Sequence, residues 1–102
     1  METTDGALLS IVQVGRHNLN AGPDFFNGQV RINDQLWAGN IEIHIKSSDW
    51  YAHRHQEDKA YDNVVLHVVW EHDVEVFTKD GNALPTLVLN GRVMKKTLDA
   101  YH

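Results

Sequence analysis

Two adjoining apolar stretches constrain this chain more than any other feature. The runs "FFNGQVRI" and "LWAGNIEIHIK" are rich in β-branched and aromatic residues, and only the polar segment "NDQ" separates them. Such residues favour strands, and a short polar break between two strands favours a hairpin. We therefore expect an antiparallel hairpin over residues 25–46 at the centre of the fold.

The second run alternates between apolar and polar side chains near its end. Successive side chains of a strand point to opposite faces. One face then carries Ile41, Ile43 and Ile45, and the other carries Glu42, His44 and Lys46. We expect the isoleucine face to be buried, because an antiparallel strand commonly turns its polar face outward.

The remaining elements follow from similar signals. We expect a first strand at residues 8–14 and a loop at 15–24, where Gly, Asn and Pro interrupt the pattern. The run "VVLHVVW" (residues 64–70) is apolar on both faces and predicts a central strand, with Leu66 and Val68 in the core.

The segments around this central strand are less regular. Ser47 or Ser48 is suited to cap a short helix that ends by Asp62. Residues 73–90 resemble a second hairpin with its turn at Asp80-Gly81. Residues 91–102 predict a closing helix.

These elements predict an α+β fold. It would have a mixed or mainly antiparallel β-sheet and one or two short helices, with an all-β sandwich or roll as the alternative. The chain of 102 residues has room for one modest core, so residues 1–102 should form a single domain. The form of the last segment suggests the amino-terminal part, or a truncated form, of a longer protein.

Composition narrows the classes of function. The net charge of −5 gives no broad basic field for coating nucleic acid or anionic lipid. Without cysteine, a disulfide scaffold or a thiolate metal site is impossible. No apolar run has membrane-spanning length and the start does not resemble a signal peptide, so we expect a cytoplasmic protein with no membrane partner.

Carboxylates and a histidine form the first predicted site. Asp24 precedes one strand of the expected hairpin and Glu42 lies in the other, so folding can bring them together. Two carboxylates that share Mg²⁺ or Mn²⁺ are typical of phosphodiester hydrolases. His44 or Lys46 would then orient the attacking water or offset developing charge.

A histidine-rich segment forms the second predicted site. His53, His55 and Asp58 have the donor types that bind Zn²⁺ or Fe²⁺. However, residues two apart in a helix point to different sides. We therefore expect His53 and His55 to be rim residues, with Asp58, and not joint ligands of one ion. We interpret His67, on the central strand, as a buried histidine at the rim of the first site.

The phrases "AGPDF", "GNIEIH", "SSDW" and "YDNVVLHVVW" are specific when they occur together. Their combination resembles an uncharacterised bacterial family known only as a domain of unknown function. The likeness covers nearly the whole chain. Proteins of that family are longer, which agrees with the expected truncation, but the family implies no activity.

A wider resemblance is to the restriction-endonuclease-like core, the PD-(D/E)xK nuclease superfamily. Pro23-Asp24 is similar to the first half of its motif, and Glu42-Ile43-His44 to the second. The resemblance implies that Asp24 and Glu42 hold the cation, helped by the Ile43 carbonyl. His44 stands where that superfamily has lysine, and the first helix of that core is either missing or upstream of this sequence.

Three hypotheses result. The first is a metal-dependent phosphodiesterase of nuclease type that acts on nucleic acid. The second is a non-catalytic β-rich interaction module, which packs with the rest of a longer chain or self-associates through exposed strand edges. The third is a histidine metal site built from His44, His53, His55 and Asp58. The first requires Asp24 and Glu42 to be close, and the third requires the helix histidines to face His44.

Overall fold

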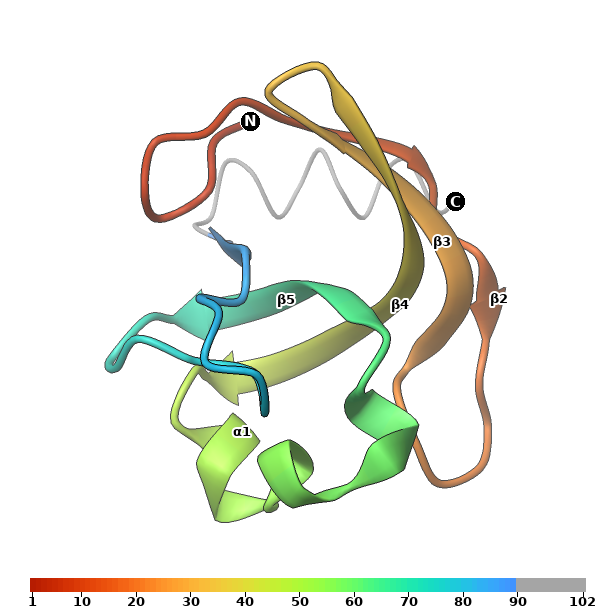
Figure 1. Ribbon diagram of the computed structural model, residues 1–102, viewed down its shortest axis with the longest axis vertical. Helices are drawn as coiled ribbons and strands as arrows, with labels where there is room; N and C mark the ends of the chain where they lie inside the picture. Colours follow the sequence, from red (N-terminus) through yellow and green to blue (C-terminus); the bar gives the residue numbers. More distant parts are fainter. Residues whose placement is uncertain (90–102) are drawn as a thin grey trace.

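The computed structural model describes residues 1–89, and one six-stranded sheet dominates this part of the chain (Figure 1). The strands are β1 (Leu9–Gln13), β2 (Arg16–His17), β3 (Phe25–Ile32), β4 (Gln35–Lys46), β5 (Val64–Glu71) and β6 (Thr86–Val88). The segment between β4 and β5 holds a helix, α1 (Asp49–Ala52), and two 3-10 turns, η1 (His55–Glu57) and η2 (Lys59–Tyr61).

The sheet is mixed, as expected. Its order is β1-β3-β4-β5-β6, and β2 pairs with β3 beside β1. The β1, β2 and β4 strands run antiparallel to β3, whereas β5 is parallel to β4 and β6 is parallel to β5. The expected hairpin of residues 25–46 and the central strand at 64–70 are confirmed. The helical part is smaller than an α+β class implies, so the described domain is mainly β.

The two long strands have unequal lengths, and this mismatch positions the site. Pairing between β3 and β4 runs from Ile32 opposite Gln35 to Phe25 opposite Ile41. Beyond Ile41, β4 continues to Lys46 beside β5. The last part of β4 therefore extends past the start of β3, and Figure 1 shows α1 next to this end.

Two hydrophobic clusters form the core. The larger joins the sheet strands through Leu9, Val30, Ile41, Leu66, Val68 and Leu87. The smaller connects α1 to the sheet and to the chain after β5, through Trp50, Val64, Val76 and Leu84. Burial of these side chains is the main stabilising contribution.

The expected burial of the isoleucine face is wrong for the end of β4. Ile41 is buried, but Ile43 and Ile45 are 45% and 71% exposed, whereas Glu42 is only 4% exposed. The alternation itself holds, since Ile41 and Ile43 align with the buried residues Leu66 and Val68 of β5. Packing explains the reversal, because the α1 segment lies against the opposite face of this end of β4.

The expected second hairpin is also wrong as a strand pair. A turn does form at Asp80-Gly81, where the Gly81 N–H donates to the Thr78 carbonyl at 2.9 Å. Its flanks make only an isolated bridge, and β6 pairs with β5 instead. Pairing with β5 buries Thr86 and Leu87, which a separate hairpin would leave outside the core.

Three smaller outcomes complete the comparison. The loop at residues 15–24 contains the two-residue strand β2, which sequence did not indicate. The expected helix between β4 and β5 is broken into α1, η1 and η2. The closing helix at residues 91–102 lies outside the described residues.

A pair of substitutions on one strand face tests this core assignment. Ile41→Ala should lower the free energy of unfolding by about 2–5 kcal/mol, as large-to-small core changes do. Ile43→Ala should lower it by only about 1 kcal/mol, because that side chain is half exposed. Chemical denaturation of both variants measures the difference. Equal losses would contradict the burial described here.

Candidate metal centre

The segment after β4 folds back over the sheet. Hydrogen bonds hold its first residues in place, and a left-handed residue further along changes its direction. Ser47 is fully buried, and its hydroxyl accepts the backbone N–H groups of Asp73 and Val74, both at 3.1 Å. The Asp73 carboxylate in turn accepts the Ser48 N–H at 2.9 Å. The Ser48 hydroxyl also donates to the Asp73 carboxylate, at 2.6 Å, and the two hydrogen bonds from Ser48 hold the pKa of Asp73 below its usual value. They tie the end of β4 to the chain that follows β5.

A left-handed residue brings the two histidines of this segment to the same side. Helix α1 ends at Ala52, and His53 is its carboxyl-terminal cap. Arg54 has a φ of 57°, in the left-handed region, and η1 begins at His55. The reversal at Arg54 breaks the helical spacing that would have separated His53 from His55.

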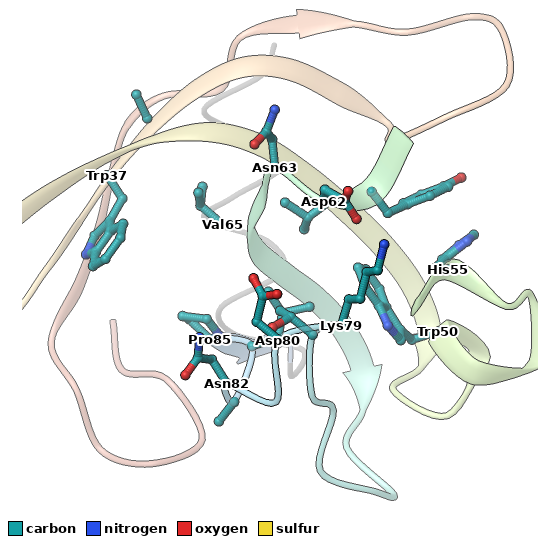
Figure 2. Close-up of a pocket in the computed structure, with 16 residues that line it drawn as sticks. Trp37, Trp50, His55, Asp62, Asn63, Val65, Lys79, Asp80, Asn82 and Pro85 are labelled. Carbon is teal, nitrogen blue, oxygen red and sulfur yellow. The ribbon is translucent and has the colours of Figure 1, made fainter. Parts of the chain in front are cut away.

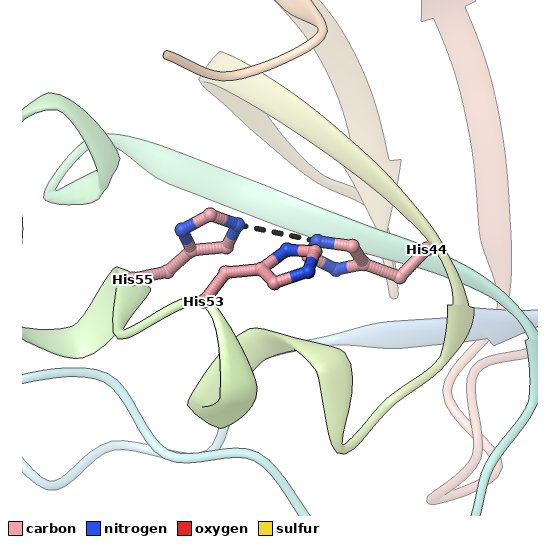
Figure 3. Close-up of side chains that lie close together, drawn as sticks. All are labelled: His44, His53 and His55. Atoms are coloured by element: carbon pink, nitrogen blue, oxygen red, sulfur yellow. Dashed lines mark hydrogen bonds between the residues drawn. The ribbon is translucent and has the colours of Figure 1, made fainter. Parts of the chain in front are cut away.

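Three histidine side chains converge above β4 (Figure 3). One ring nitrogen from each of His44, His53 and His55 lies within 4.8 Å of the others. The Nε2 atoms of His44 and His55 are 3.2 Å apart. Oε2 of Glu42 is 3.0 Å from Nε2 of His55 and 3.7 Å from Nε2 of His44. Nitrogen and oxygen donors thus face one small volume.

These separations fit a tetrahedral ion. Zinc binds imidazole nitrogen at about 2.0–2.1 Å, so two tetrahedral ligands lie roughly 3.3 Å from each other. The 3.2 Å between the His44 and His55 nitrogens matches this value. His53 is exposed and could close the remaining gap by a change of side-chain rotamer. The residues therefore fit a three-histidine site with a carboxyl group beside it.

The carboxyl group of Glu42 is held by the start of β3. The Asp24 N–H donates to Oε1 of Glu42 at 3.2 Å, and Oδ2 of Asp24 accepts the Ile43 N–H at 2.8 Å. Burial raises the pKa of Glu42 to about 9, and the adjacent Asp24 carboxyl adds to the shift. Glu42 is thus a neutral acid at pH 7 when no cation is near.

Burial keeps His44, His55 and His67 neutral. Burial, and after it the neighbouring histidines, lower the pKa of His55 to about 4 and that of His67 to about 3. The pKa of His44 is lowered for the same two reasons. Neutral imidazole is the form that binds metal, so protons need not be displaced from these rings.

Aromatic side chains enclose the inner side of the cluster. Trp50 is 1% exposed, and its ring centroid lies 5.3 Å from that of His55 and 5.4 Å from that of His67. Tyr61 stacks on His55 with 3.7 Å between ring centroids. Burial raises the pKa of Tyr61 to about 12, so its hydroxyl keeps its proton.

A pocket adjoins the cluster (Figure 2). Its volume is about 910 Å³, within the range of small-molecule sites. His55, Trp50 and Tyr61 line one end, and Trp37 and Lys79 are among its other lining residues. His55 therefore belongs to both the pocket lining and the histidine cluster.

The structure brings together only some of the predicted site residues. Asp24, Glu42 and His44 are adjacent, as the first hypothesis requires. Lys46 instead pairs with Glu71 at an exposed position, with 3.9 Å between the charged atoms. The predicted role of Lys46 in catalysis therefore gains no support from its position.

The histidine-rich segment differs from its predicted place. His55 is only 7% exposed, so its assignment to a surface rim is wrong, whereas His53 is exposed. Asp58 is exposed and caps η2 by accepting the Ala60 N–H at 2.9 Å. The helical spacing that motivated the rim assignment ends at Arg54. Sequence analysis also passed over Tyr61, an aromatic residue that no spacing rule singles out.

The fold and the side chains together define a mixed-sheet domain with a partly buried cluster of histidines and a carboxyl group. The chain belongs to the family described as "Protein of unknown function (DUF2851)", whose model matches residues 1–102. No curated protein and no solved structure matches the chain. The expected family resemblance is confirmed, and the comparisons give the nuclease superfamily no support. Within residues 1–89, no helix is long and apolar enough to cross a membrane.

The shifted pKa values predict how stability depends on pH in metal-free protein. An unfolded Glu42 ionises near pH 4.5 but the folded one only near pH 9, so the free energy of unfolding falls as pH rises through this window. Unfolded His55 and His67 take up protons below pH 6.5, but the folded residues do so only near pH 4 and pH 3. Below pH 6.5 these two protons outweigh the one that Glu42 releases on unfolding, so stability is lost as pH falls and a maximum near pH 6.5 results.

Glu42→Gln should remove the decrease in the free energy of unfolding on the alkaline side of this maximum. Release of one proton on unfolding corresponds there to a slope of about 1.4 kcal/mol per pH unit. Glu57→Gln is the matched control, because its carboxylate is exposed in the 3-10 turn η1. Denaturant titrations from pH 5 to about 9 in the presence of a chelator measure both. An unchanged alkaline slope in Glu42→Gln would contradict the neutral buried acid.

Proposed function

We propose that the domain is a divalent-metal centre of hydrolytic type, with a transition metal such as Zn²⁺ held by His44, His53 and His55. The observation that carries the proposal is the approach of one nitrogen from each ring to within 4.8 Å of the others. Three protein ligands leave a fourth position for water or substrate, an arrangement typical of catalytic zinc. When bound, such an ion polarises an oxygen of the substrate and activates water.

Glu42 has the position of a general acid–base group in this proposal. Its Oε2 is 3.0 Å from the His55 nitrogen and is therefore next to the proposed ion. A cation held by these histidines would lower the pKa of the buried carboxyl from its value of about 9 towards neutrality. A group with a pKa near the working pH both accepts and donates protons efficiently. Asp24 positions Glu42 through its backbone N–H.

The adjoining pocket supports a substrate of small-molecule size or the end of a longer chain. Its lining combines aromatic rings with the ammonium group of Lys79 and the carboxylate of Asp80. Figure 2 shows Lys79 beside Trp50 and Asp80 beside Pro85 among the lining residues. A substrate held there would present its reacting group to the histidine end, because His55 is the shared wall.

Metal binding should be visible as a gain in stability. With zinc at a hundred times its dissociation constant, the free energy of unfolding should rise by about 2.7 kcal/mol. His53→Ala should lose most of this gain without unfolding, because His53 is exposed. His17→Ala is the matched control, since His17 is an exposed histidine on β2. Thermal unfolding and calorimetric titration give the shift and the stoichiometry.

Two outcomes would overturn this proposal. One is a wild-type protein whose stability does not respond to zinc. The other is a response that persists in both His53→Ala and His55→Ala, which would locate the ion elsewhere.

A second candidate function is the phosphodiesterase, with Mg²⁺ or Mn²⁺ shared by Asp24 and Glu42. Two features favour it. The Asp24 and Glu42 carboxyl groups are close enough for one to raise the pKa of the other. The β3–β4 hairpin is also followed by α1 and a parallel strand, β5, an order of strands, helix and strand that is similar to the restriction-endonuclease-like core. Hard cations prefer such oxygen ligands.

The two functions make opposite demands on Asp24 and His53. If Mn²⁺ binds between the carboxylates, Asp24→Asn should abolish stabilisation by Mn²⁺ and cleavage of DNA, and His53→Ala should leave both unchanged. If the histidines hold the ion, His53→Ala should abolish stabilisation by Zn²⁺, and Asp24→Asn should weaken it only modestly. Parallel titrations of the two variants with both metals separate these cases.

A further inference from the structure

His67 lies behind the cluster and contacts it through one hydrogen bond. It is on β5, directly beside Glu42 of β4 in the parallel register, and none of its surface is exposed. Its Nε2 is 2.7 Å from Nδ1 of His44. Its other ring nitrogen, Nδ1, is buried without a hydrogen-bond partner. His67 is therefore connected to the site on one side only.

The two nitrogens of His44 have separate tasks. Nε2 faces the cluster, at 3.2 Å from His55 and 3.7 Å from Glu42. Nδ1 faces away from it, towards His67. A ring that binds metal through Nε2 must carry its proton on Nδ1, and that N–H then needs an acceptor. Nε2 of His67 is the acceptor in place.

One proton therefore decides the state of both rings. If Nδ1 of His44 carries the proton, it donates to His67, and the proton of His67 must be on its own Nδ1. If His67 donates instead, the proton of His44 moves to Nε2, which then cannot bind a metal ion. Both arrangements satisfy the 2.7 Å contact, and they differ in whether His44 is ready to be a ligand.

We propose that His67 is a positioning residue that holds His44 in its metal-binding tautomer by accepting the hydrogen bond from its Nδ1–H. The inference rests on the proposed metal centre. The partners that orient such ligands are commonly carboxylates, carbonyls or water, and their loss typically lowers metal affinity 10–100-fold. Here a neutral imidazole takes this role, in a layer shielded from water by Trp50.

The surroundings of His67 favour a role in the site over a role in stability. Its Nδ1 has no partner, and an unpaired buried polar group costs stability. Its neighbours Leu66 and Val68 are buried and apolar, so an aliphatic residue would suit the strand. Replacing His67 by leucine should therefore change the melting temperature little while weakening the site.

The test compares His67→Leu with His67→Gln in the whole chain. The glutamine side chain offers an oxygen that accepts a hydrogen bond, and leucine offers none. Zinc affinity, measured by calorimetry, should fall 10–100-fold in His67→Leu and change only a few-fold in His67→Gln. Long-range ¹H–¹⁵N spectra of histidine-labelled protein should show His44 protonated on Nδ1 in the zinc-loaded wild type.

Each outcome bears on a definite claim. Zinc binding by wild type with equal affinity in His67→Leu overturns the role of His67 and leaves the metal centre standing. Spectra that show His44 bound through Nδ1 also overturn it, even if His67→Leu fails to fold. A wild-type protein that does not bind zinc overturns both the metal centre and this inference.

Discussion

The structure depends on the difference in length between β3 and β4. Twelve residues of β4 meet only eight of β3, so the end of β4 leaves its antiparallel partner behind and continues beside the parallel strand β5. The carboxylate of Asp24, just before β3, accepts the backbone N–H of Ile43 that β3 no longer reaches. A side chain thus completes the ladder, and the same residue holds Glu42 from its backbone. The site begins where regular pairing ends.

That arrangement buries several polar side chains in a small core, and this burial has an energetic cost. Glu42 and His67 are almost fully enclosed, and His55 is close to it. Glu42 contacts His55 and His67 contacts His44, but Nδ1 of His67 has no hydrogen-bond partner. Burial, together with the nearby carboxyl of Asp24, keeps Glu42 in its neutral form. A cation would relieve this cost, because it attracts the carboxylates and uses the lone pairs of neutral imidazoles. The folded protein therefore has a site at Glu42 and the histidines where binding of a cation is favourable.

Sequence reasoning predicted the hairpin, the central strand and the approach of Asp24 to Glu42, because strand alternation and hairpin pairing are local rules. It failed where long-range packing decides. Alternation could separate Ile43 from Glu42 but could not say which face the α1 segment would cover. The position of β6 depends on the free edge of β5, which lies far away along the chain. The convergence of His53 and His55 depends on the backbone of Arg54, a residue type with no preference for the left-handed region.

The two sides of the histidine cluster are anchored with unequal strength. His44 belongs to a long strand flanked by β5, whereas His53 caps the short helix α1 and His55 begins the 3-10 turn η1. Opening such turns breaks few backbone hydrogen bonds, while opening β4 disrupts the sheet. The rate at which an ion enters or leaves would then be set by local opening of the turn and not by global unfolding. In hydrogen exchange, the amides of the turn should respond to the ion more than those of the sheet.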